Sequence, residues 1–431
     1  MQMPARRKVL GAFAAAVTAG CAITAAAVPA RAAAAGQRGN HTGHHRGWVA
    51  AWTGSSTRGG ADTSGCPAHS GVGDATVRDI VYPHAAGDRV RVRLTNLFGD
   101  RPLKVGRATV AVRGDGAAVV PGTMRELRFH GRPSTTVRTG GLLRSDPVPL
   151  RVRRGQELAV SIYLPEATGP ATQHPLALQD GYLADGDHAA AGSGGAYGTT
   201  LDCQLFADAV DVTPGPRVAG TLVTLGDSIT DGTLSTPNAN HRWPDYLARR
   251  MWRRHGARMS VANAGISGNE VLRDRVPVKY GPSALHRLDR DVLGQPGIRT
   301  VILLEGINDI GADAATAPAI IDGYKRLIHR VHARHVRIFG GTLTAFGGSN
   351  GRYGGQYGTK WGERQRLAVN RWIRHSGAFD GVIDFAKAIA DPSDPHRMDP
   401  GYDSGDHLHP GDTGYAAMAA AINIPGLLPR H

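Results

Sequence analysis

Short runs in which apolar and polar residues alternate fill the chain from Trp48 to about Val212. Residues such as Gly, Pro and Asp separate these runs, of which the clearest are 75–82, 89–95, 108–113, 126–130 and 158–164. Alternation with a period of two predicts strands with one buried face, and strands at this spacing favour packed antiparallel sheets. We therefore expect an all-β sandwich or a jelly-roll-like region here.

The pattern changes after residues 211–216, which read Asp-Val-Thr-Pro-Gly-Pro. Beyond them, five short apolar runs alternate with segments long enough for helices: 221–225, 259–263, 300–304, 336–343 and 381–385. The segment from Thr316 has the clearest helical period, with one apolar face formed by Ile320, Ile321, Tyr324, Leu327, Ile328 and Val331. Strands that alternate with helices predict a five-stranded parallel sheet with flanking helices, and the Pro- and Gly-rich cluster predicts a domain boundary.

The N-terminus has the pattern of a signal peptide. Three basic residues at 6–8 precede an uncharged run rich in Ala and Gly, and Ala30-Arg31-Ala32 offers a small-x-small cleavage site. We expect export by the Sec or twin-arginine route, with a single membrane anchor or lipidation at Cys21 as the alternatives. The predicted organisation is a signal peptide at 1–32, a linker at 33–46, a β-rich domain at 47–213 and a second domain at 217–431.

Charge and cysteine content narrow the possible partners and the compartment. The formal charge is +14, from 50 Lys and Arg against 36 Asp and Glu, and loss of the four basic residues of the signal peptide leaves about +10. The basic residues are scattered and form no recognisable nucleic-acid module, so we expect a basic surface that binds no nucleic acid. Cys66 and Cys203 remain after export, which predicts a disulfide, with two separate buried thiols as the alternative.

Polar residues follow the predicted strands of the second domain. Ser228 comes after the first strand, Gly268 after the second and Asn308 after the third, while Asp406 and His409 follow the fifth. Because the carboxyl ends of parallel strands meet at one edge of a sheet, we expect these residues to lie close together. A nucleophile, an imidazole with a carboxylate, and N–H donors are the groups that acyl transfer requires.

Four short motifs resemble those of the SGNH (GDSL) hydrolases, whose name records Ser, Gly, Asn and His in four blocks. They are Gly-Asp-Ser-Ile at 226–229, Asn-Ala-Gly-Ile-Ser-Gly at 263–268, Gly-Ile-Asn-Asp at 306–309 and Asp-His-Leu-His at 406–409. The chain also looks like a subgroup of secreted esterases with a β-rich N-terminal domain. The resemblance implies an SGNH/flavodoxin-like sheet and no metal or cofactor.

The resemblance also implies a role for each residue. Ser228 would attack the ester carbonyl, His409 would take and return its proton, and Asp406 would orient the imidazole. Ser228 N–H, Gly268 N–H and the Asn308 amide would form the oxyanion hole. Asp227 is expected to hold the nucleophile turn by hydrogen bonds. Glu305 and Asp309 flank Asn308, and we expect them either to touch substrate or to have structural roles.

Three other segments of the sequence each allow two interpretations. Residues 347–351 read Gly-Gly-Ser-Asn-Gly and fit a nucleophile elbow at Ser349, but a glycine-rich loop follows in place of a helix, so Ser228 is favoured and the loop is expected to form a wall of the cleft. An acidic stretch predicts a solvated loop, with a calcium site as the alternative, at Asp391, Asp394, Asp399 and Asp403. Histidines in the linker at 41, 44 and 45 allow a metal site, although a linker explains them.

The sequence thus predicts an exported serine esterase that forms an acyl-enzyme. Its substrate would be a small-molecule or polymer-borne ester, and we expect a monomer that needs no cofactor and does not stay inserted in a membrane. The alternative is a carbohydrate- or envelope-binding protein in which the β-rich domain binds and the hydrolase-like domain is inactive.

Overall fold

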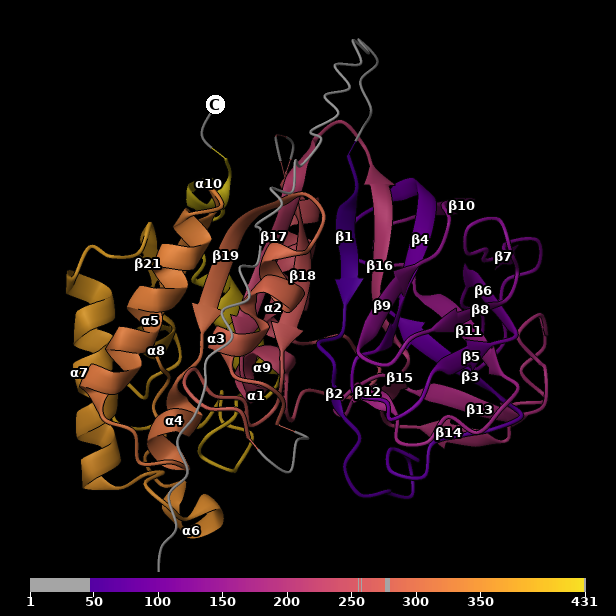
Figure 1. Ribbon diagram of the computed structural model, residues 1–431. Coiled ribbons are helices and arrows are strands. Elements are labelled where there is room, and N and C mark those ends of the chain that lie inside the picture. The colour runs from indigo at the N-terminus through magenta and orange to yellow at the C-terminus, as the bar shows by residue number, and fades with distance from the viewer. Residues whose placement is uncertain (1–46, 255, 257, 276–279, 430–431) are drawn as a thin grey trace, which may run out of the picture. The chain divides into compact units, whose positions relative to one another are not determined.

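A five-stranded parallel sheet forms the centre of the C-terminal half of the chain (Figure 1). A computed structural model describes residues 47–254, 256, 258–275 and 280–429. The strands run in the order β18 (Arg258–Gly265), β17 (Val218–Gly226), β19 (Ile298–Leu304), β20 (Arg337–Gly341) and β21 (Gly381–Ile383), and every neighbouring pair is parallel. All five strands predicted from the sequence are confirmed.

The apolar composition of these strands follows from burial on both faces. Leu222, Val223 and Leu225 are consecutive or nearly so in β17, yet none is exposed to solvent. A strand covered by helices on each side needs no polar alternation. The helical elements are α1 (Ser228–Asp231), α2 (Trp243–Trp252), α3 (Ala284–Arg287), the π-helical turn η1 (Leu288–Leu293), α4 (Ile307–Gly311), α5 (Ala317–His332), α6 (Asn350–Tyr353), α7 (Lys360–His375), α8 (Phe385–Ala388), α9 (Asp412–Ala420) and α10 (Ile424–Leu427).

The helices pack in two groups, α2 with α9 and α5 with α7. Helix α5 begins directly after Thr316, as predicted. Of the apolar face expected for it, Ile321 is half-buried and the others are buried: Ile320, Tyr324, Leu327, Ile328 and Val331. Their side chains join those of the strands in one hydrophobic cluster. The helical period in the sequence therefore reflects burial against the sheet.

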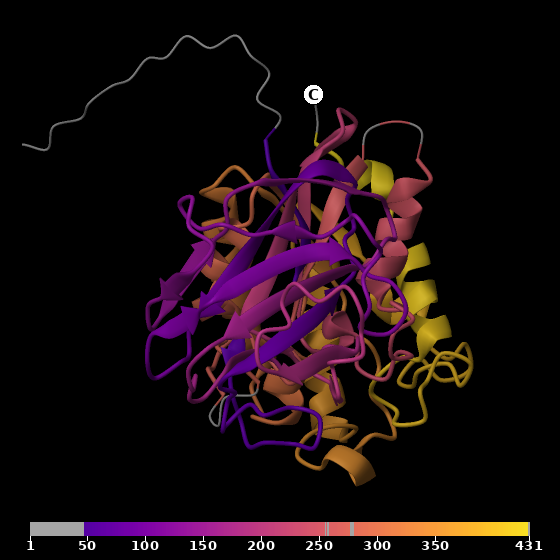
Figure 2. The same cartoon turned by 90° about the vertical axis from the view of Figure 1, so that its right-hand side faces the viewer.

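Antiparallel sheets make up the β-rich region that precedes the parallel sheet, and Figure 2 shows them in front. One sheet contains β1 (Val49–Thr53), β16 (Ala207–Pro214), β4 (Gly87–Asn96), β10 (Val148–Val152) and β9 (Gly141–Arg144). A second contains β14 (Thr199–Leu201), β13 (Gly181–Asp185), β3 (Ala75–Val81), β11 (Leu158–Leu164), β6 (Arg107–Val112) and β7 (Arg125–Glu126). Smaller sheets pair β15 (Gln204–Leu205), β12 (Thr172–His174) and β2 (Thr57–Arg58), and β5 (Leu103–Val105) with β8 (Thr135–Val137).

Alternate residues of the two larger sheets meet in one hydrophobic cluster, as in a β-sandwich. Val92 in β4 and Val160 in β11 are both fully buried there. The strand expected at 126–130 shrinks to the two residues of β7, because His130 and Gly131 have positive φ angles of 54° and 79° and turn the chain back. The other predicted strands of this region are present.

Strand β1 belongs to both halves of the described chain. Val49 and Ala51 point into the core of the β-rich region, whereas Ala50, between them, packs into the cluster around the parallel sheet. The backbone N–H of Ala50 donates to Thr221 Oγ1 at 3.1 Å, and Ser260 Oγ donates to the Ala50 carbonyl at 2.6 Å. The period of two in a strand thus lets β1 face two cores at once.

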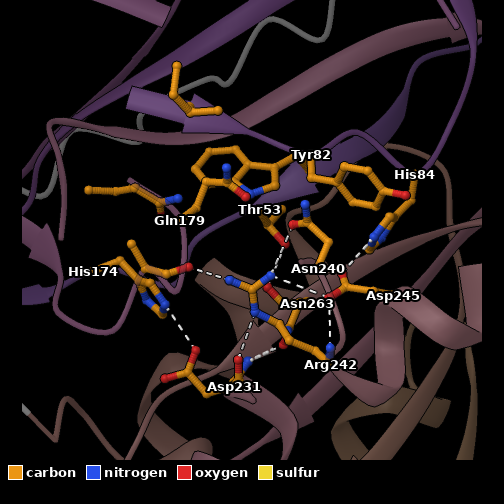
Figure 3. A pocket seen from close by; sticks show the side chains of 15 residues that line it. Thr53, Tyr82, His84, His174, Gln179, Asp231, Asn240, Arg242, Asp245 and Asn263 are labelled. Carbon is orange, nitrogen blue, oxygen red and sulfur yellow. Dashed lines mark hydrogen bonds and ion pairs between the residues drawn. The ribbon is translucent and has the colours of Figure 1, made fainter. Parts of the chain in front are cut away.

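A polar cluster also joins the two halves, around a cavity of about 30 Å³ (Figure 3). His84 Nε2 lies 2.9 Å from Asp245 Oδ1, and His174 Nε2 lies 3.0 Å from Asp231 Oδ1. The guanidinium of Arg242 lies between the pairs and donates to the Asp231 carbonyl at 3.0 Å. Each histidine comes from the β-rich region and each aspartate from the residues around α1 and α2.

Cys66 and Cys203 form a disulfide, which confirms that prediction. Residues 1–32 and 33–46, expected to be a signal peptide and a linker, lie outside the described residues. Within the described part of the chain, no helix is long and apolar enough to cross a membrane. The described residues group as one unit, and the boundaries proposed at 47–213 and 217–431 stay a prediction.

Candidate active site

Ser228 is placed by the turn that ends β17. The strand stops at Gly226, and Asp227 caps α1 by accepting a hydrogen bond from the Ile229 N–H at 3.0 Å. Ser228 is therefore the first residue of a short helix and is only 5% exposed. This is the hydrogen-bonding role expected for Asp227, and it directs Ser228 beyond the carboxyl edge of the sheet.

Asp406 and His409 project from a single turn. Asp406 Oδ1 accepts hydrogen bonds from two backbone N–H groups, those of Leu408 at 2.9 Å and His409 at 2.8 Å. His407, between them, has a positive φ of 62°. The other carboxylate oxygen, Oδ2, lies 2.7 Å from His409 Nδ1, and His409 Nε2 lies 2.8 Å from Ser228 Oγ. Ser228 thus joins a turn that lies 181 residues further along the sequence, and the three residues form one hydrogen-bonded chain.

The charge state of Asp406 decides the direction of these bonds. Burial opposes ionisation, but hydrogen bonds from His409 and its charge hold the pKa of Asp406 well below its usual range. An ionised carboxylate can only accept, so the proton of the neutral imidazole is on Nδ1. Nε2 then has a free lone pair and accepts the hydrogen bond of the Ser228 hydroxyl. The arrangement suits removal of the hydroxyl proton.

Gly268 and Asn308 lie next to each other at the same edge. Asn308 Nδ2 donates to the carbonyl of Asn269, which follows Gly268, at 2.9 Å. Gly268 has a φ of +77°, and a Cβ there would lie 2.1 Å from a ring carbon of Tyr280. Among the described residues, the Gly268 N–H has no acceptor within hydrogen-bond distance. A backbone donor and a side-chain donor are therefore available beside one turn, as an oxyanion hole requires.

Comparison with known families agrees with this geometry. Residues 224–417 match the GDSL-like lipase/acylhydrolase family. This part of the chain is a GDSL-like lipase/acylhydrolase domain. No curated protein matches the sequence. The domain assignment establishes a hydrolase family without specifying the ester.

Several solved structures are similar to about half of this chain. The lipase/acylhydrolase from Enterococcus faecalis is 21% identical, with 47% of this chain and 92% of that chain covered and a TM-score of 0.36. The GDSL-like lipase from Bacteroides thetaiotaomicron is 17% identical, with 48% and 88% covered and a TM-score of 0.36. The psychrotrophic esterase EstA from Pseudoalteromonas sp. is 16% identical, with 47% and 93% covered and a TM-score of 0.35.

The alternatives from the sequence are placed differently. Ser349 is fully buried, and its Oγ donates to the carbonyl of Phe346 at 2.6 Å. Among the described residues, its hydroxyl has no hydrogen bond to a histidine. In the acidic stretch, Asp391 accepts from Ser393 at 2.7 Å and Asp403 lies 2.6 Å from His407 Nδ1. Within the described ranges, the side chains grouped closely enough for a metal are Cys66, Asp202 and Cys203, and both cysteines are in the disulfide.

Arg287 was not predicted from the sequence, and it holds the strand ends of the GDSL-like domain together. Its guanidinium is fully buried and donates to the Gly226 carbonyl at 2.9 Å and to the Ala264 carbonyl at 2.6 Å. A third bond reaches Asn269 Oδ1 at 2.8 Å. Arg287 therefore ties the ends of β17 and β18 to the turn that contains Gly268. Nothing in its local sequence distinguishes it from a surface arginine.

Asp231 and His174 were missed as well. Asp231 Oδ2 accepts hydrogen bonds from the N–H and the Oγ of Ser267, each at 2.9 Å, and Ser267 directly precedes Gly268. Its other oxygen faces His174, whose Nδ1 lies 2.9 Å from the Ser55 carbonyl. Burial disfavours the imidazolium, but the charge of Asp231 and these hydrogen bonds raise the pKa of His174. The β-rich region thus contacts the Gly268 turn through one aspartate.

Carboxyl groups beneath the edge are buried without full compensation. Burial raises the pKa of Asp227 to about 7 and that of Glu305 to about 8. Glu305 is fully buried, and among the described residues neither of its carboxyl oxygens has a hydrogen-bond partner. Asp309 accepts from the N–H groups of Val271 and Leu272 at 2.9 and 3.0 Å, and burial raises its pKa to about 6. Asp309 therefore holds the backbone at Val271 and Leu272, while Glu305 lies 3.8 Å from the buried guanidinium of Arg287.

Proposed function

We propose that this protein is a serine esterase that hydrolyses carboxylic esters through an acyl-enzyme on Ser228. The observation that carries the proposal is the continuous hydrogen-bonded chain from Ser228 through His409 to Asp406. The family assignment gives the reaction class, and the chain supplies the nucleophile, the base and the carboxylate that the class requires.

Acylation starts with the Ser228 hydroxyl. His409 Nε2 takes its proton as Oγ bonds to the ester carbonyl carbon, and the carbonyl oxygen becomes an oxyanion. Donors for that charge are the N–H groups of Ser228 and Gly268 and the Nδ2 hydrogen of Asn308 that does not bond Asn269. The imidazolium then protonates the leaving alcohol as the carbon–oxygen bond breaks, which leaves the acyl group on Ser228.

Deacylation repeats these steps with water. His409 removes a proton from a water molecule, whose oxygen attacks the acyl carbon. The second tetrahedral intermediate collapses, the proton returns to Ser228 Oγ, and the carboxylic acid leaves. Asp406 stays ionised throughout, since its low pKa keeps it charged while it stabilises the imidazolium.

Covalent labelling combined with an ester panel tests the proposal. p-Nitrophenyl esters of increasing acyl length should be hydrolysed, and a fluorophosphonate should inactivate the protein with one phosphonyl group on the peptide that contains Ser228. The panel also measures how long an acyl chain the site accepts. Absence of both hydrolysis and labelling in a folded protein would refute the esterase and leave the carbohydrate- or envelope-binding alternative.

We also propose that the protein is exported after removal of residues 1–32. The disulfide supports an oxidising compartment, where such bonds persist. N-terminal sequencing of protein recovered outside the cytoplasm should begin at Ala33. A mature chain that still begins near Met1 would contradict cleavage.

A further inference from the structure

The glycine-rich segment from Gly347 to Gly358 is a folded part of the site and not only its wall. It contains α6, and its glycines Gly348, Gly354, Gly355 and Gly358 all have positive φ angles. The Gly347 N–H donates to the His396 carbonyl at 2.9 Å, and the Gln356 N–H donates to the Gly311 carbonyl at 2.7 Å. The segment is thus fastened at both ends.

Two tyrosines of this segment contact the two halves of the site. We propose that Tyr353 positions Asp406 and that Tyr357 positions Asn308, so that one segment aligns both the proton-transfer chain and the oxyanion donor. This inference rests on the proposed esterase function. Tyr353 and Tyr357 are four residues apart, and their ring centroids lie 5.7 Å apart.

The hydroxyl of Tyr353 acts on the carboxylate of the triad. It donates to Asp406 Oδ2 at 2.6 Å, the same oxygen that takes the hydrogen bond from His409 Nδ1. Burial and the hydrogen bond to Asp406 raise the pKa of Tyr353 to about 12, so the phenol keeps its proton at neutral pH. Its ring also packs edge-on against the His409 ring at a centroid distance of 5.9 Å. Tyr353 therefore fixes the carboxylate and shares its negative charge.

The hydroxyl of Tyr357 acts on the amide of Asn308. It donates to Asn308 Oδ1 at 2.6 Å, while Nδ2 on the other side donates to the Asn269 carbonyl at 2.9 Å. A phenol that donates requires the oxygen on its side of the amide, so the two bonds together fix which end carries N–H. Both Tyr357 and Asn308 are buried, and a flipped amide would leave a carbonyl against a carbonyl.

Phenylalanine substitutions test this inference because they remove only the hydroxyl. Tyr357→Phe should lower kcat for a p-nitrophenyl ester by about fivefold to tenfold with KM nearly unchanged, since a lost neutral hydrogen bond has that value. Tyr353→Phe should lower kcat by about threefold to tenfold. It should also move the acid limb of the kcat/KM profile to a pH about half a unit higher. Without the hydrogen bond from Tyr353, the Asp406 carboxylate stabilises the protonated imidazole of His409 more strongly.

A matched control is Tyr163→Phe. Tyr163 OH donates to Asp74 Oδ1 at 2.8 Å in the β-rich region, so the substitution removes the same type of bond away from the site. Its kcat and pH profile should equal those of the wild type. Melting temperatures of all variants check that the packing survives.

A double-mutant cycle separates a positioning role from a general structural one. If Tyr357 acts through Asn308, Tyr357→Phe should have little further effect on kcat in the Asn308→Ala background. An equal loss in both backgrounds would overturn the role of Tyr357, and an unshifted acid limb would overturn that of Tyr353. Either of these two results would refute a tyrosine role but not the esterase function, provided that Ser228 of the wild type is labelled by the fluorophosphonate. A wild-type protein that shows neither hydrolysis nor labelling would refute the esterase function and the tyrosine roles together.

Discussion

The parallel sheet and the β-rich region use buried polar groups in different ways. At the carboxyl edge of the parallel sheet, Ser228 bonds His409, which comes from the same turn as Asp406. Asn308 lies at this edge too and donates to the Asn269 carbonyl. In the β-rich region, buried charged side chains pair with each other, as Arg93 Nε does with Asp208 Oδ1 at 2.6 Å. Successive parallel strands end at the same edge, whereas neighbouring antiparallel strands end at opposite edges. The direction of the strands therefore determines whether the polar residues that follow them lie close together at one edge of the sheet.

One residue of the β-rich region contacts the site at the edge of the parallel sheet. His174 lies in β12 of the β-rich region, yet it pairs with Asp231, which holds the turn before Gly268. Substitutions on the parallel edge should mainly change activity, and those in the β-rich region should mainly change stability. His174 should change both.

Ser228→Ala should have the largest effect. Without Oγ no acyl-enzyme forms, and kcat should fall by at least about 10³-fold while the melting temperature stays near that of the wild type. Ser349→Ala is the matched control and should keep at least half of the activity, because the Ser349 hydroxyl donates to the Phe346 carbonyl. Steady-state kinetics with one p-nitrophenyl ester would decide. An active Ser228 variant beside an inactive, folded Ser349 variant would reverse the assignment.

Asn308→Ala should lower kcat by about 10²–10³-fold, the usual cost of one oxyanion donor. KM should change little, because the donor acts mainly in the transition state. Asn308→Asp provides a comparison of similar size in which a carboxylate faces the oxyanion. Unchanged turnover in the alanine variant would remove Asn308 from the oxyanion hole.

Replacement of both Cys66 and Cys203 by Ala should affect stability instead of catalysis. The bond closes a sequence separation of 137 residues, and the chain-entropy model gives about 4–5 kcal/mol for such a loop. Urea unfolding should therefore show a lower midpoint, while kcat of the folded variant stays unchanged. A drop in kcat as large as that of Asn308→Ala would show that the two regions are not separable in this way.

His174→Asn should give the smallest effects, but on both properties. Loss of the bond to Asp231 should lower kcat about two- to fivefold through the Gly268 turn. The pKa of His174 is raised by Asp231 against burial and Arg242, so the pair stabilises the fold fully below pH 6.5, and this contribution disappears as pH rises through the raised pKa. The difference in melting temperature from the wild type should therefore narrow from pH 6 to pH 9. A constant difference would contradict a charged pair.

The candidate site was largely predictable where a residue type stands directly after a strand. Ser228, Gly268 and Asn308 each follow a buried apolar run, and Asp406 and His409 share one turn, so sequence order and strand direction bring them together. Tyr353, Tyr357 and Arg287 were not predictable. Their partners are a carboxylate, an amide and strand-end carbonyls that lie from 23 to 61 residues away in the sequence.

Local sequence determined the elements of this protein, because alternation, helical period and glycine turns report which face of each segment is buried. It also determined the order of Ser228, Asp406 and His409, which is a property of the chain itself. Only the tertiary structure decided which polar groups support them. The hydrogen bonds from Tyr353 to Asp406 and from His174 to Asp231 join segments that are distant in the sequence. The positions of these segments relative to each other depend on the packing of the whole core and not on any local pattern.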